Sequence, residues 1–117
     1  MGNKTIKFSL IVAIVSKGNA ETVMDAAKKA GAEGGTIING RGTGIHENLK
    51  LFGISIEPEK EIIFILIDTL QSEKVLHSVS KAAELHLPGK GIAFVLEVDQ
   101  VVGICHLQNP SSADPAR

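Results

Sequence analysis

The sequence predicts an α+β protein in which one antiparallel sheet carries two helices on one face. Four apolar runs rich in Ile and Val are separated by two stretches with helical spacing of Val, Leu and Ala. In chain order these segments read β-α-β-β-α-β, the order of a ferredoxin-like split β-α-β unit. The 117-residue length fits a single domain, which we place at residues 1–107.

The first half of this pattern is a strand over residues 6–15, a helix over 20–30 and a strand over 36–40. Asn19 is suited to an N-cap, and Gly31 to the position after the helix C-terminus. Val and Ala residues at three-four spacing form the apolar face of the helix.

The second half begins with a strand that starts at residue 59 or 60 and ends at 68. A helix follows from 71 or 72 to near 86, and then a strand over 92–98, which residues 101–105 continue or follow with a short fifth strand. The tail, residues 108–117, contains two Pro, two Ser and two Ala, and we expect it to be disordered.

The predicted strands are apolar at nearly every position rather than at alternate positions. Two helices on one face leave the other face uncovered, so we expect a second subunit to cover it. The alternative is a monomer whose excess Ile and Val simply build a robust core.

Composition narrows the range of functions that this chain could have. The net charge of −1 gives no support for nucleic-acid binding, and the single Cys105 favours a reducing, cytoplasmic setting. The apolar stretch near the N-terminus is too short to span a bilayer, which takes roughly 20 residues. His46 and Glu47 are neighbours, as are Cys105 and His106, but neither pair has the spacing of a metal or nucleophilic site.

Two glycine-rich loops are the candidate binding elements. In the first, residues 39–44, Gly residues alternate with Arg41 and Thr43, so exposed N–H groups and a guanidinium can hold an anion. In the second, Lys90 stands between Gly89 and Gly91, and its ammonium can contact a phosphate. The alternatives are a plain strand connection and a tight turn with a solvated Lys.

With both loops identified, the chain resembles the PII signal-transduction family over residues 6 to about 107. The resemblance rests on the element order, on the Asn-Gly-Arg-Gly-Thr-Gly opening of a long loop, and on Pro-Gly-Lys-Gly before a Phe-Val strand. It implies a non-enzymatic regulator, with nitrogen metabolism as the expected pathway. It also implies a homotrimer that binds an adenine nucleotide (ATP, ADP or AMP) between subunits and docks its long loop onto a membrane transporter or an enzyme. The ligand contacts carried over by the resemblance are Arg41, Gly42, Gly89, Lys90 and Gly91.

The chain departs from the family pattern at several points. It has no Tyr for uridylylation, and its loop, residues 43–58, is shorter. Ile92 stands where the family has a phosphate-contacting Lys, and residues 100–106 contain no Arg. The sequence is therefore that of a divergent, PII-like member.

Three functions compete: a ligand-binding sensor, a structural interaction module without a small-molecule ligand, and, less favoured, an enzyme of phosphoryl chemistry. The loop favours docking, because apolar residues left in water are unfavourable. The docking candidates are Leu49, Leu51, Phe52, Ile54 and Ile56. We expect residues 45–57 to be mobile in the free protein and ordered on a partner, the alternative being a fixed strand pair packed on the trimer.

Overall fold

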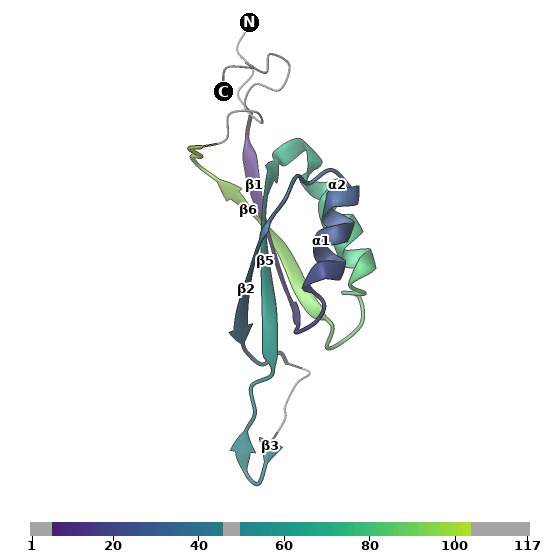
Figure 1. Ribbon diagram of the computed structural model, residues 1–117, viewed down its shortest axis with the longest axis vertical. Coiled ribbons are helices and arrows are strands. Elements are labelled where there is room, and N and C mark those ends of the chain that lie inside the picture. The colour runs from purple at the N-terminus through teal and green to yellow at the C-terminus, as the bar shows by residue number, and fades with distance from the viewer. Residues whose placement is uncertain (1–5, 46–49, 104–117) are drawn as a thin grey trace, which may run out of the picture.

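The computed structural model describes residues 6–45 and 50–103. Its elements are β1 (Phe8–Ser16), α1 (Ala20–Lys29), β2 (Thr36–Arg41), β3 (Lys50–Leu51), β4 (Ile54–Ser55), β5 (Glu59–Asp68), α2 (Thr69–Ala82) and β6 (Gly91–Val98). The main sheet has the order β2-β5-β1-β6 with every neighbouring pair antiparallel. Both helices lie on one face of this sheet, and β3 projects well away from it (Figure 1). The predicted ferredoxin-like α+β fold is confirmed.

The core lies between the sheet and the helices. Ile11 of β1 pairs with Ile65 of β5, and both are fully buried. Val23 of α1 and Val75 of α2 close this layer and are also fully buried. Because side chains alternate along a strand, the residues between these must face the other way.

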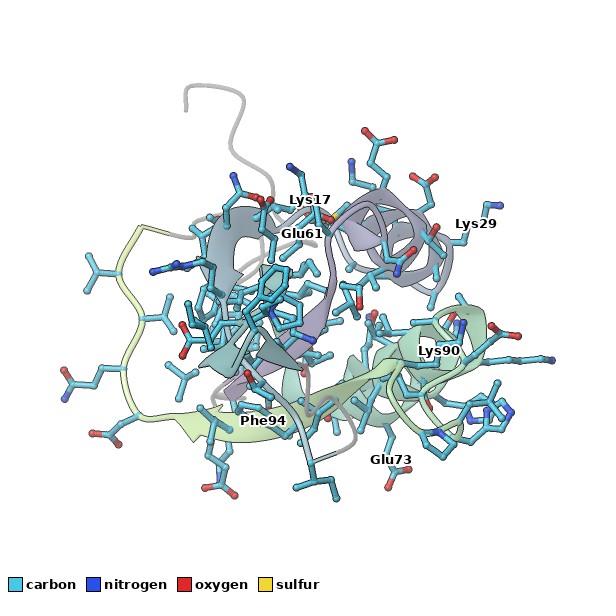
Figure 2. The ribbon with its side chains drawn as sticks, turned by 90° about the horizontal axis from the view of Figure 1, so that it is seen from below. Lys17, Lys29, Glu61, Glu73, Lys90 and Phe94 are labelled. Carbon is cyan, nitrogen blue, oxygen red and sulfur yellow. The ribbon has the colours of Figure 1, made fainter. Side chains whose placement is uncertain are left out.

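The other sheet face is apolar and open. It carries Leu10 opposite Leu66, with Ile92 and Leu96 of the edge strand β6 exposed by 55% and 49%. Phe94 lies on the same strand between them, 38% exposed (Figure 2). The predicted uncovered face is therefore present in the single chain.

The start of α1 is held from the sheet. Asn19 occupies the N-cap position, but its side chain makes no capping hydrogen bond. Instead Oε1 of Glu61, on β5, accepts hydrogen bonds from the backbone N–H groups of Gly18 and Ala20, each at 2.9 Å. Figure 2 shows Glu61 beside the turn that leads into α1. A carboxylate from a neighbouring strand thus replaces the expected side-chain cap.

Helix α2 is displaced toward the N-terminus relative to its predicted bounds. It begins at Thr69 because Asp68 caps it, with Oδ1 accepting from the N–H of Leu70 at 2.9 Å. It ends at Ala82, well before His86, because Glu84 turns into the left-handed region with φ 56°.

Residues 101–103 do not form the strand that was predicted to continue or follow the last strand, β6. The remainder of the predicted fifth strand, with Cys105 and His106, and the tail over 108–117 lie outside the described residues. No helix in the described part of the chain is both long and apolar enough to cross a membrane.

Candidate functional site

A cavity of about 750 Å³ forms where the two glycine-rich loops meet, and we call it the junction cavity. Residues 41–45 line one side of it, and residues 85–89 with Gly91 and Ile92 line the other. Its floor includes Ile14, Lys60 and Ile62 from the two central strands.

Local backbone geometry brings the loops together. The first loop leaves the sheet at the Arg41–Glu59 pair, and the N–H of Gly42 donates to the carbonyl of Pro58 at 3.1 Å. The second loop returns through Gly91, which has φ 136° and lies so close to β1 that a Cβ would collide with the carbonyl oxygen of Ile14. Only glycine fits that position.

Four of the five predicted ligand residues line the cavity: Arg41, Gly42, Gly89 and Gly91. Lys90 does not. Its Nζ lies 3.5 Å from Oε1 of Glu84, and Figure 2 places Lys90 beside the turn that follows α2. Gly89 and Gly91 therefore line the cavity, whereas the ammonium of Lys90 between them pairs with Glu84.

Sequence reasoning missed Lys60 and His86, which also line the cavity. Lys60 is only 9% exposed, an unusual position for a lysine. Its sequence neighbours gave no motif, since it looked like the polar start of a strand. His86 was expected near the end of the second helix, but the helix stops at Ala82 and His86 lines the cavity from the loop that follows.

The chemistry of these groups suits an anion rather than a metal. Arg41 and Lys60 supply positive charge, and the glycine-rich loop supplies backbone at close range. Within residues 6–45 and 50–103, no group of three or more His, Cys, Asp or Glu side chains is arranged to hold a metal ion.

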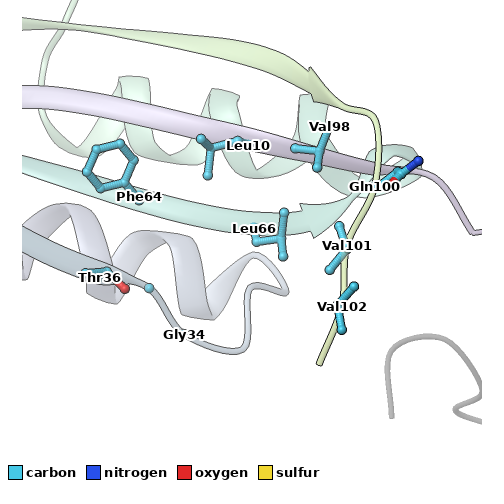
Figure 3. A pocket seen from close by; sticks show the side chains of 10 residues that line it. Leu10, Gly34, Thr36, Phe64, Leu66, Val98, Gln100, Val101 and Val102 are labelled. Carbon is cyan, nitrogen blue, oxygen red and sulfur yellow. The ribbon is translucent and has the colours of Figure 1, made fainter. Parts of the chain in front are cut away.

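A second cavity, of about 640 Å³, opens on the uncovered sheet face at the opposite end of the strands. Leu10, Phe64 and Leu66 form its sheet side, and Val101 and Val102 approach from the segment after β6 (Figure 3). Its wall is mainly apolar and belongs to the open sheet face.

The loop that begins at the junction cavity carries an exposed hairpin. Leu51 pairs with Ile54 across a turn in which Phe52 has φ 52° and Gly53 φ 79°. Two successive positive φ values are the mark of a type I′ turn, which favours Asn-Gly at these positions. Phe52 is 94% exposed at the tip.

The other predicted docking residues are distributed around this tip. Ile54 and Ile56 are exposed by 69% and 39%. Leu51 lies in β3, and Leu49 lies outside the described residues. The short strand pair predicted as the alternative is present, and in the single chain the exposed residues Phe52 and Ile54 do not pack on the main sheet.

Together the fold and the site define a ferredoxin-like domain with a glycine-lined cavity at the base of an exposed loop. Residues 8–106 match the family model described as nitrogen regulatory protein P-II. The chain therefore belongs to the P-II family, which confirms the resemblance seen in its loops. Proteins of this family are trimeric regulators that act through partners, not enzymes.

The crystal structure of Arabidopsis thaliana PII bound to citrate is similar, with a TM-score of 0.67 and 28% sequence identity. The match covers 85% of this chain and 84% of that one. No curated protein matches the chain by sequence.

Proposed function

We propose that this protein is a PII-like regulator: a homotrimeric, cytoplasmic sensor that binds a small anionic ligand and controls a partner protein. The observation that carries the proposal is the junction cavity, because it joins both glycine-rich loops to the base of the exposed hairpin. A ligand there would contact Arg41 and Gly42, the residues from which the hairpin loop departs. An adenine nucleotide (ATP, ADP or AMP) is the ligand class we propose, with nitrogen metabolism as the pathway.

A thermal-shift screen tests the ligand. ATP, ADP, AMP, cyclic nucleotides and citrate, which Arabidopsis PII binds, would each be added to the purified chain. A true ligand at 100 times its Kd stabilises the fold by about 2.7 kcal/mol. Arg41→Ala should reduce that shift. If no compound raises the midpoint, the structural interaction module without a small-molecule ligand becomes the better explanation.

The trimer is proposed from the open apolar face. Ile92, Phe94 and Leu96 leave edge-strand side chains partly in water, and burying such surface is worth roughly 25 cal/mol per Å². Size exclusion with light scattering should give about 37 kDa, three times the 12.4 kDa of one chain. A monomer at micromolar concentration would refute this part of the proposal.

Docking through the hairpin is the output we propose, with a membrane transporter or an enzyme as partner. A two-stranded hairpin is marginally stable alone. We therefore expect fast amide exchange over residues 45–57 in the free protein and slower exchange in a complex. Strong protection in the isolated protein would show that the segment is already fixed and does not order on docking.

A further inference from the structure

The second glycine-rich loop is built from two successive turns. In the first, the N–H of Leu87 donates to the carbonyl of Glu84 at 3.0 Å. In the second, the N–H of Lys90 donates to the carbonyl of Leu87 at 3.4 Å. The central residues of the second turn are Pro88 and Gly89, with φ 81° at the glycine, and a type II turn favours both. The loop therefore has a defined backbone.

Both ends of this loop are fixed to the rest of the fold. The N–H of Leu85 donates to the carbonyl of Ser80 in α2 at 3.0 Å. At the other end, Gly91 fits closely against the carbonyl of Ile14 in β1. His86 lies within the first turn, lines the junction cavity and is exposed in the single chain. A ligand in the cavity thus meets His86 on a backbone that is already ordered, which lowers the entropic cost of the contact.

Histidine is the side chain whose charge ordinarily changes between pH 5 and 8. Among the described residues that line the cavity, His86 is the only one of this kind. Arg41 of β2 and Lys60 of β5 line it too, but Arg and Lys side chains ordinarily stay charged across this range.

The loop and the helix before it carry three further charged groups. Lys90 and Glu84 pair with each other at 3.5 Å, and Lys81 lies in the last turn of α2. None of the three is among the described residues that line the cavity. His86 is thus the group through which pH alters the charge that this chain presents to the cavity.

Resting on the proposed function, we propose that His86 is a ligand-contacting residue whose imidazolium donates a hydrogen bond to the anionic group of the ligand, so that affinity rises as the pH falls. An imidazolium has two N–H donors and a positive charge, and charge-assisted hydrogen bonds are the stronger ones. The neutral ring keeps one donor and loses the charge. Binding and protonation therefore favour each other, and affinity stops rising once His86 is protonated in the free protein.

Titration calorimetry on the full chain at pH 6 and pH 8 tests this, with AMP, ADP, ATP and citrate as the probes. The quantity compared is the Kd of His86→Asn divided by the Kd of the wild type. A terminal phosphate itself titrates near pH 6, and a second subunit adds charges of its own, but both act equally on the two proteins. For a probe that binds, we expect a ratio of about five at pH 6 and about one at pH 8, since exposure weakens a charged hydrogen bond.

Two further variants separate a ligand contact from a structural role. His77→Asn is the matched control, because His77 is exposed on α2 and is not among the described residues that line the cavity. Its ratio should stay at about one at both pH values. His86→Arg carries a permanent charge, so it should match the wild type at pH 6 and bind the probe about fivefold more tightly than the wild type at pH 8.

The outcomes distinguish this inference from the proposed function. A ratio for His86→Asn that is the same at both pH values, with a probe bound, would overturn the inference and leave the proposed function in place. Failure of every probe to bind at either pH would overturn both. If His86→Asn does not fold, His86→Arg decides, because the inference requires tighter binding than the wild type at pH 8 and equal binding at pH 6.

Discussion

Glu61, a half-buried carboxylate on β5, should contribute more to stability than the exposed carboxylates do, because it holds the start of α1. In Glu61→Ala the backbone N–H groups of Gly18 and Ala20 lose the carboxylate oxygen to which they donate. Gly18 is exposed, so water replaces the carboxylate there at little cost. Ala20 is 3% exposed, and an unsatisfied buried donor is unfavourable by about 1–3 kcal/mol.

The charge adds a second contribution. A carboxylate at a helix N-terminus is worth about 0.3–1 kcal/mol through the helix dipole. We therefore expect Glu61→Ala to lower the free energy of unfolding by about 2 kcal/mol. Glu61→Gln keeps an acceptor oxygen and loses the charge, so it should lie between Glu61→Ala and the wild type.

Urea unfolding followed by far-UV circular dichroism measures both variants, at one fixed protein concentration because assembly shifts apparent stability. The control is Glu73→Ala, an exposed helical carboxylate, which should change stability by no more than about 0.5 kcal/mol. If Glu61→Ala is no more destabilising than this control, the cross-strand cap does not stabilise α1 and the reasoning fails.

Three further predictions concern single positions. Phe52→Asn should relieve the strain of the positive φ at the turn and therefore slow amide exchange in the hairpin. It also removes the aromatic side chain at the tip and should weaken partner binding. Unchanged amide exchange would refute the strain argument. Gly91→Ala should destabilise the fold by more than about 2 kcal/mol in urea unfolding, because its Cβ meets backbone, whereas Gly89→Ala has positive φ but open space and should cost about 1 kcal/mol. A hydrogen bond from Lys17, 2.8 Å away, lowers the pKa of Glu59 below its ordinary 4.5 and raises that of Lys17 above 10.5. The Lys17–Glu59 ion pair therefore stabilises the fold at pH values between these two, and this stabilisation is lost as the pH falls through the folded-state pKa of Glu59. The difference in Tm between the wild type and Glu59→Gln should accordingly be small and should vanish in acid.

The order of elements could be predicted because it is encoded locally, in apolar runs and glycine breaks. Which strand residues face the helices could not be predicted, because Leu10 and Ile11 are chemically alike. Alternation puts them on opposite faces, but only the packing shows that Ile11 is the one buried in the core beneath the helices. The same alternation separates Lys60 from Glu61: one lines the cavity and the other caps α1.

The candidate site likewise contains features that the sequence predicted and features that it did not. Arg41 and Gly42 were identifiable from a motif. The engagement of Lys90 by Glu84 was not, because a glutamate in a left-handed turn leaves no sequence signal of the kind that glycine gives.

The hydrogen bond from Gly42 to Pro58 joins the two ends of the exposed loop at the wall of the junction cavity. Five steps along the chain lead from Gly53 at the tip to Pro58, a reach of about 16 Å in extended chain. A ligand bound at Arg41 and Gly42 would therefore fix the point from which the tip at Phe52 ranges, and so limit the positions that the tip can reach.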